Sequence, residues 1–223
     1  MSEIVEYKPT AGMNAAQRND AGYYAVIKAW VQSLSEIFEK YFTITYNDTN
    51  YYIYFNASAE NISDRRVRLT ISSHNCSIHF LRDSSSSQWD GSAQLSLDND
   101  DPFYIYDGDD FFIGGGTKKC FAGIFKGKAF DTNTDVPVFI GSGSSSIRLW
   151  INNGTQLQYT SSYRREAGLT NTYIVQRSIL TNTNVVMQNV CYLDSGMSLP
   201  PANDFKIGND KYCKIDYNIV VKI

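Results

Sequence analysis

Residues 66–80 read RVRLTISSHNCSIHF, and their alternation decides the fold. Side chains on a β-strand point to opposite faces in turn, so a step of two between apolar residues is typical of a strand with one buried face. The stretch therefore predicts two strands, each with an apolar face toward a core. The apolar positions are Val67, Leu69, Ile71, Cys76, Ile78 and Phe80.

The step of two extends on both sides of this stretch. Residues 43–46 and 51–55 flank a polar turn and predict a hairpin. Alternation from Ile215 to Ile223 predicts a C-terminal strand paired within a sheet. The 16 Tyr and 12 Phe of the chain also suit half-buried pleated surfaces. We therefore expect a mostly β fold, sandwich or barrel-like, over residues 43–223, either undivided or split into two β subdomains near 114–130.

The segment before residue 43 has a different period. Over residues 14–42 the apolar side chains recur at steps of three and four, and Asn19 or Asp20 can cap the first turn. This predicts one N-terminal amphipathic helix, packed either on its own β domain or on a neighbouring subunit. In the second case the candidate interface consists of Tyr23, Ile27, Trp30, Leu34 and Phe38.

Residues 1–13 predict an extended N-terminal arm, since Pro9 and Gly12 disfavour regular structure there. Terminal arms are poorly ordered unless something holds them. We expect this arm to be ordered by lying on another subunit or on a partner protein.

Charge and composition exclude several kinds of partner. The net charge is −3, and nucleic-acid binding needs clustered positive charge, so no nucleic-acid partner is predicted. No apolar run approaches the roughly 18 residues of a membrane-spanning helix. The first residues lack the basic and apolar regions of a signal peptide, which indicates synthesis in the cytoplasm. The four cysteines form no C-x-x-C pair, and we expect reduced, buried thiols.

Motifs for catalysis and metal binding are weak. His74 and Cys76 are two residues apart and would share a strand face, which is half of a zinc site without a second half. The Gly-x-Ser-x-Gly motif of a nucleophilic serine is absent. We predict no catalytic residue, no metal site and no cofactor, and hence not an enzyme.

Six aspartates lie between Asp98 and Asp110. Carboxylates on loops can bind Ca²⁺, and paired acids can hydrolyse glycosides, but the spacing fits no EF-hand. Solvated turns are the favoured interpretation. Trp89 and Trp150 stand beside polar stretches and are candidate surface ligand contacts, because exposed aromatic rings stack on sugars or anchor protein interfaces.

The two ends of the chain carry a resemblance. The C-terminal segments 192–197, 205–212 and 217–223 look like the ends of small virion and tail proteins of tailed bacteriophages and prophages. The opening order of arm, aromatic helix and hairpin is similar to such proteins as well. The resemblance implies a repeated structural subunit of a tail, baseplate or head, and it carries over no catalytic or binding residue.

These observations predict a non-enzymatic structural subunit of a bacteriophage or phage-tail-like particle. Its partners would be copies of itself and other virion or tail proteins, and its location the virion after synthesis in the host cytoplasm. The alternative is a carbohydrate-binding or host-receptor-binding β module, with a host-surface glycan as partner.

Overall fold

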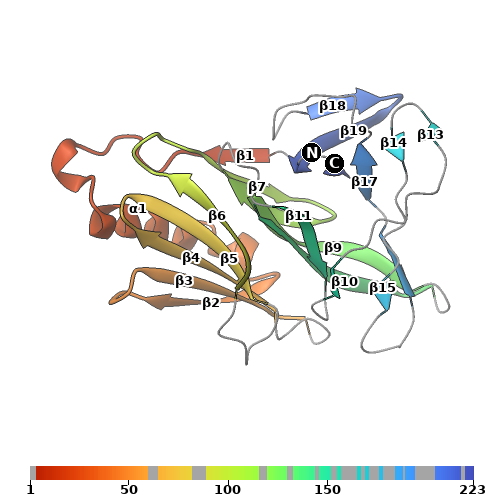
Figure 1. Cartoon of the computed structure of the whole chain (residues 1–223), viewed down its shortest axis with the longest axis horizontal. Helices are drawn as coiled ribbons and strands as arrows, with labels where there is room; N and C mark the ends of the chain where they lie inside the picture. Colours follow the sequence, from red (N-terminus) through yellow and green to blue (C-terminus); the bar gives the residue numbers. More distant parts are fainter. Residues whose placement is uncertain are drawn as a thin grey trace.

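The protein is mostly antiparallel β-sheet with one main helix near the N-terminus, which confirms the predicted fold class (Figure 1). The strands form three sheets, named A, B and C below, in an arrangement that fits a β-sandwich. None of the described helices is long and apolar enough to cross a membrane. The structure, a computed structural model, describes residues 4–59, 65–81, 89–115, 120–129, 133–143, 146–151, 155–156, 165–166, 169–170, 176–177, 184–187, 189–193, 204–216 and 219–223.

The helical region is shorter than the predicted residues 14–42. The Asn19 side chain accepts a hydrogen bond from the Gly22 amide at 3.0 Å and caps the main helix, as expected. Leu34, at φ −110° and ψ 20°, interrupts the helix, which is why it is divided. The elements are η1 (Ala15–Gln17), α1 (Asp20–Ser33) and α2 (Ser35–Phe38).

Sheet B follows the chain in order and confirms the predicted alternation. Its strands are β2 (Phe42–Asn47), β3 (Tyr52–Ala57), β4 (Arg66–Ser72), β5 (Asn75–Leu81) and β6 (Trp89–Ser96). Ile53 and Phe55 are buried, whereas Tyr52 and Tyr54, which alternate with them along β3, are half-buried. We call the side of sheet B that carries Ile53 and Phe55 the core face, and the opposite side the outer face.

Sheet A is the largest sheet. Its main path is β1-β7-β8-β9-β10-β11-β12, and β16 joins β15 to β9. Strands β8 and β9 pair directly with each other, and the division into two subdomains near 114–130 stays a prediction. The strands are β1 (Ile4–Tyr7), β7 (Phe103–Asp107), β8 (Phe111–Gly115), β9 (Cys120–Ala129), β10 (Asp135–Gly143), β11 (Ser146–Ile151), β12 (Thr155–Gln156), β15 (Gln176–Arg177) and β16 (Asn184–Met187).

Part of the N-terminal arm belongs to sheet A. Strand β1 pairs antiparallel with β7, with Val5 opposite Ile105. Tyr7 stacks on Trp30, with ring centroids 4.3 Å apart and planes 4° from parallel. The expectation that the arm is ordered on another subunit is therefore wrong for residues 4–7, because backbone pairing and ring stacking hold them on their own chain.

Sheet C contains the C-terminal strands in the order β13-β14-β17-β20-β19-β18. The last strand pairs with both β17 and β19, which confirms the predicted pairing of the C-terminus. The strands are β13 (Arg165–Glu166), β14 (Leu169–Thr170), β17 (Val190–Leu193), β18 (Asp204–Ile207), β19 (Asp210–Asp216) and β20 (Ile219–Lys222).

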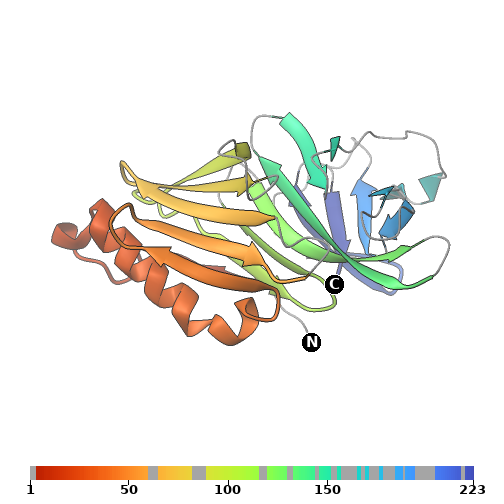
Figure 2. The same cartoon turned by 90° about the horizontal axis from the view of Figure 1, so that it is seen from below.

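Helix α1 lies along the core face of sheet B (Figure 2). Its aromatic side chains also reach sheet A, since Trp30 lies 5.4 Å from Phe103 between ring centroids. Phe38 of α2 packs on Phe55 at 5.1 Å and on Phe111 at 5.8 Å. One apolar core therefore joins the helices to both sheets.

This packing corrects the proposed helix interface. Tyr23, Ile27 and Phe38 are 0% exposed and Trp30 is 8% exposed, all within the chain's own core. Leu34 is partly buried against the same core. The stripe packs on its own β domain, the first of the two alternatives, and these side chains are not open to a neighbouring subunit.

Candidate functional site

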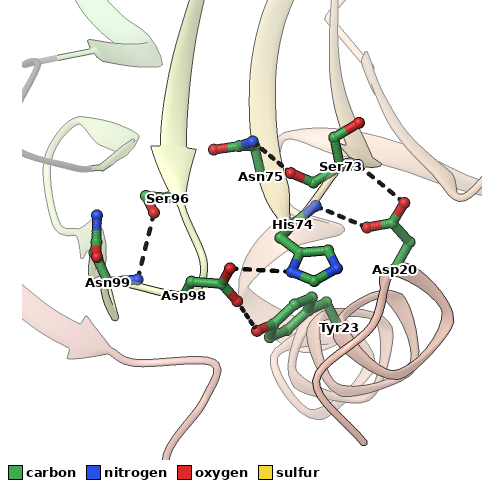
Figure 3. Close-up of polar contacts among 8 residues, drawn as sticks. All are labelled: Asp20, Tyr23, Ser73, His74, Asn75, Ser96, Asp98 and Asn99. Atoms are coloured by element: carbon green, nitrogen blue, oxygen red, sulfur yellow. Dashed lines mark hydrogen bonds and ion pairs between the residues drawn. The ribbon is translucent and has the colours of Figure 1, made fainter.

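Polar side chains gather where three turns meet at the N-terminal end of α1 (Figure 3). Asp20 comes from the first turn of α1. Ser73 and His74 form the two-residue turn between β4 and β5. Asp98 comes from the turn that follows β6. Segments far apart in the sequence thus share one end of sheet B.

Asp20 fastens the β4–β5 turn to the helix. Its carboxylate accepts hydrogen bonds from the backbone amides of Ser73, at 2.9 Å, and His74, at 2.8 Å. Both turn residues are left-handed, with φ of 51° and 60°, a conformation that costs an L-residue about 1–2 kcal/mol. The two bonds offset part of that cost. A carboxylate in the first helical turn also interacts favourably with the positive end of the helix dipole.

Asp98 connects the helix to the same turn. The Tyr23 hydroxyl donates to one carboxylate oxygen at 2.6 Å, and His74 Nδ1 lies 3.0 Å from the other. The hydrogen bonds from Tyr23 and His74 lower the pKa of Asp98 below its usual value. Burial, followed by the Asp98 hydrogen bond, raises the pKa of Tyr23 to about 12. Tyr23 therefore remains a neutral donor at physiological pH.

The chemistry open to His74 is limited by its neighbours. Its side chain is 49% exposed, and its ring meets the Tyr23 ring edge-on at 5.9 Å. A histidine paired with an aspartate can carry a proton, but acyl transfer also needs a nucleophile bonded to the ring. Within the described part of the chain, no hydroxyl or thiol bonds to His74. The geometry supports a structural role for the site, in which hydrogen bonds hold the three turns together.

The half zinc site predicted at His74 and Cys76 is not formed. Cys76 is 0% exposed on the core face, whereas His74 belongs to the preceding turn and faces solvent. The expectation that they share a strand face is wrong because the strand begins only at Asn75. Among the residues that the structure describes, no three His, Cys, Asp or Glu side chains form a metal-binding group.

The six aspartates between Asp98 and Asp110 are divided between the two ends of β7. At one end, Asp98 bonds to Tyr23 and His74, and Asp101 accepts a hydrogen bond from the Ser96 amide at 2.8 Å. A strand rises about 3.3 Å per residue, so the five residues of β7 hold the two groups roughly 16 Å apart. The six aspartates therefore do not form one acidic cluster, although they are close in sequence.

The other end of β7 carries Asp107 and its neighbours. Asp107 pairs with Lys40 at 2.8 Å and accepts from the Tyr41 hydroxyl at 3.1 Å. Asp110 is 1% exposed and accepts a hydrogen bond from the Lys126 amide at 2.6 Å. Burial is the largest cause that raises the pKa of Asp110. These carboxylates fasten the β7–β8 turn to the helix region and to β9.

The two candidate ligand-contact tryptophans are placed only by their backbones. Trp89 begins β6 and stands opposite Leu81 in the β5–β6 register. Trp150 lies in β11 opposite Gly141. Both side chains lie outside the described part of the chain, so their role as surface contacts stays a prediction.

Sequence reasoning missed the fastening by Asp20, Tyr23 and Asp98. Tyr23 and Asp98 are 75 residues apart, and pairing between distant turns leaves no local pattern. One signal was present: Asp20 stands directly after the capping Asn19, and such acidic residues favour a helix start.

Comparison with known proteins adds no relative. No family model, no curated protein and no solved structure matches this chain.

Proposed function

We propose that this protein is a non-enzymatic structural subunit of a tailed-bacteriophage-like particle, in its tail, baseplate or head. It acts by packing against copies of itself and against other particle proteins. The resemblance of both chain ends to virion and tail proteins supports this proposal. The described aspartates and His74 support it too, since their bonds tie turns together.

One structural observation carries the packing mechanism: β1 is the terminal strand of sheet A in its described strand order. A terminal strand presents a row of backbone amides and carbonyls to which a strand of another chain can add. Val5 lies in the middle of β1 and is 50% exposed, which sets it apart from the other large apolar side chains that the structure describes. The edge thus combines backbone groups with apolar surface.

Tyr7 keeps this edge in place. Its ring stacks on Trp30, and its hydroxyl reaches the Val26 carbonyl at 3.5 Å. The strand is therefore presented in a fixed position, which lowers the entropy cost of adding a neighbour. The occupant of the edge would be a strand of a neighbouring subunit.

The experiment compares Val5→Lys with Thr43→Lys. Thr43 is an exposed residue of β2, the terminal strand on one side of sheet B, so both variants add one charge to an exposed strand. We expect Val5→Lys to remain folded by circular dichroism and to lose assembly in sedimentation velocity. Thr43→Lys should assemble like the wild type. Equal assembly of all three proteins, or a wild type that stays monomeric with and without particle proteins, would contradict the proposal.

The position of the gene supplies an independent test. A structural subunit is expected among genes for other tail or capsid proteins. A metabolic gene cluster on both sides would argue against the proposal.

A second candidate function is a carbohydrate-binding or host-receptor-binding module. The observation in its favour is the outer face of sheet B, where tyrosines and arginines lie side by side.

A further inference from the structure

Strand β1 carries the one large apolar side chain that is exposed among those the structure describes. Val5 is 50% exposed, although it stands opposite Ile105, which is 2% exposed. Residues opposite each other in antiparallel strands share a face, so Val5 lies on the face of sheet A that packs into the core beneath α1. Val5 therefore lies at the rim of that core, on the terminal strand of the sheet.

The backbone of β1 is paired on one side in the described strand order. Its residues pair with β7, from Ile4 opposite Tyr106 to Tyr7 opposite Phe103. In an antiparallel ladder the amides and carbonyls of alternate residues point to opposite sides of a strand, so those that do not reach β7 point to the outer edge. The edge can therefore accept one further antiparallel strand beside Val5.

A second copy of β1 matches this edge. Apolar surface is covered best by apolar surface, and Val5 of another copy is the exposed large apolar side chain that the described part of the chain offers. The charges permit the same pairing. Glu6 and Lys8, each with a side chain 51% exposed, form an ion pair at 3.7 Å on their own chain. Residues 4–8 thus carry no net charge, and two copies of the edge do not repel each other.

The symmetry of such a pair fixes its register. A two-fold axis perpendicular to the sheet relates two antiparallel copies and keeps each side chain on its own face. Directly opposite residues share a face, so the axis must pass through a residue that stands opposite its own copy. Within Ile4–Tyr7, axes at Val5 or at Glu6 give the longest overlap. An axis at Glu6 would set two carboxylates directly opposite, which destabilises a strand pair, so the axis lies at Val5.

We propose that β1 pairs antiparallel with β1 of a second copy about a two-fold axis at Val5, which joins two copies of sheet A into one sheet. This inference rests on the proposed function and names the neighbour that occupies the edge. In this register Val5 covers Val5 of the second copy, and Ile4 stands opposite Glu6. Each copy uses its edge once, so the contact closes as a dimer and does not grow into a fibre.

The length of the strand sets the strength of this contact. A strand of four residues offers a small interface, and interfaces below about 1,200 Å² belong to weak, transient complexes. The stacking of Tyr7 on Trp30 holds β1 in place beforehand and reduces the entropy cost of pairing. Further contacts within a particle would raise the effective concentration of the two edges. The isolated protein should therefore form a weak, reversible dimer.

Disulfide trapping tests the register. Opposite Cα atoms in an antiparallel pair lie about 4.5–5.5 Å apart, within the range of a disulfide. Val5→Cys should form a linked dimer on mild oxidation, with the bond between the two substituted positions by peptide mapping. Glu6→Cys is the matched control on the same strand, because its two copies would lie about 8 Å apart, beyond that range. Val5→Cys should crosslink at least about tenfold faster than Glu6→Cys or the wild type, whose 4 cysteines give the background.

Mixing two charged variants tests whether the partner is the same edge. Val5→Lys and Val5→Glu should each be monomeric, because like charges would face each other across the axis. An equimolar mixture should recover the dimer, because the two introduced charges are then opposite in sign. Sedimentation velocity over a concentration series measures each sample beside the wild type, and circular dichroism verifies that each variant is folded.

Three outcomes would overturn the inference. They are Val5→Cys crosslinking no faster than the wild type, Glu6→Cys crosslinking as fast as Val5→Cys, and a mixture of the two charged variants that stays as monomeric as each alone. If Val5→Lys nevertheless prevents assembly with particle proteins, the edge takes a strand of a different protein, and the proposed function stands without this inference. If Val5→Lys assembles like the wild type, the proposed function itself fails.

Discussion

The two faces of sheet B are made by the same strands, but their side chains differ in burial and in polarity. On the core face, Ile53 and Val67 are fully buried against α1 and sheet A. On the outer face, Tyr54 and Arg68 remain half-buried, and both contact the Tyr52 ring. A strand period of two lets stability and surface recognition be encoded in alternate residues of one segment. Neighbouring residues should therefore respond very differently to substitution.

The largest expected difference lies between Phe55 and Tyr54. Phe55 is 1% exposed and packs on Phe38 and Phe42, so Phe55→Ala should cost about 3–5 kcal/mol of unfolding free energy. Tyr54→Ala on the outer face should cost less than about 1.5 kcal/mol. Urea unfolding measures both. Similar losses of unfolding free energy for the two variants would contradict the proposed difference between the two faces.

The end of the sheet should show an intermediate effect. Asp20→Ala removes two hydrogen bonds to left-handed turn residues and a charge from the first helical turn. We expect a loss of about 1–2 kcal/mol, similar to that of a helix cap. Asp20→Asn keeps one acceptor oxygen and should lose less. If both variants are as stable as the wild type, the turn does not depend on Asp20.

A smaller effect of opposite sign is expected at Asp110. Its pKa is raised, so the folded state binds the proton more tightly, and stability falls as pH rises from the usual carboxyl range through the raised value. Asp110→Asn keeps an acceptor for the Lys126 amide and removes the buried charge. The variant should be more stable than the wild type at pH 7 and lose this advantage in acid. Asp109→Asn, at an exposed neighbour, is the matched control; a less stable Asp110→Asn protein at pH 7 would refute this.

The smallest effect concerns Asp98. Its pKa is lowered, so its contribution to stability is complete above the ordinary value of 3.8 and is lost as pH falls through the folded value. Asp98→Asn should therefore flatten the acid side of the stability curve in thermal unfolding. Tyr23→Phe, which removes the first of its two hydrogen bonds, should raise the Asp98 pKa measured by NMR. An unchanged acid limb in both variants would show that the contact contributes nothing in solution.

Which features of the fold can be predicted from the sequence depends on the range of the interactions that produce them. Strands such as Arg66–Ser72 were predictable, because burial on one face leaves a local period of two. The helix start at Asn19 was predictable for the same reason, since a cap acts within one turn. What covers the helix stripe could not be predicted, because an apolar stripe fits its own sheet and a neighbour equally well.

The site shows the same limit. Five strands separate Tyr23 from Asp98 in the chain, and no spacing rule connects the two residues. The pairing of His74 with Cys76 failed because a left-handed turn at His74, φ 60°, moves the side chain off the strand face. The arm was placed on another subunit because its pairing with β7 lies about a hundred residues away in sequence.

The most direct test of the account is hydrogen–deuterium exchange of the protein alone and in its assembled state. The helix stripe is buried inside the chain, and the edge of β1 is the proposed surface for neighbours. Backbone amides of Ile4–Tyr7 should therefore gain protection on assembly, while those of Asp20–Ser33 stay unchanged. Protection gained in Asp20–Ser33, with Ile4–Tyr7 unchanged, would contradict it.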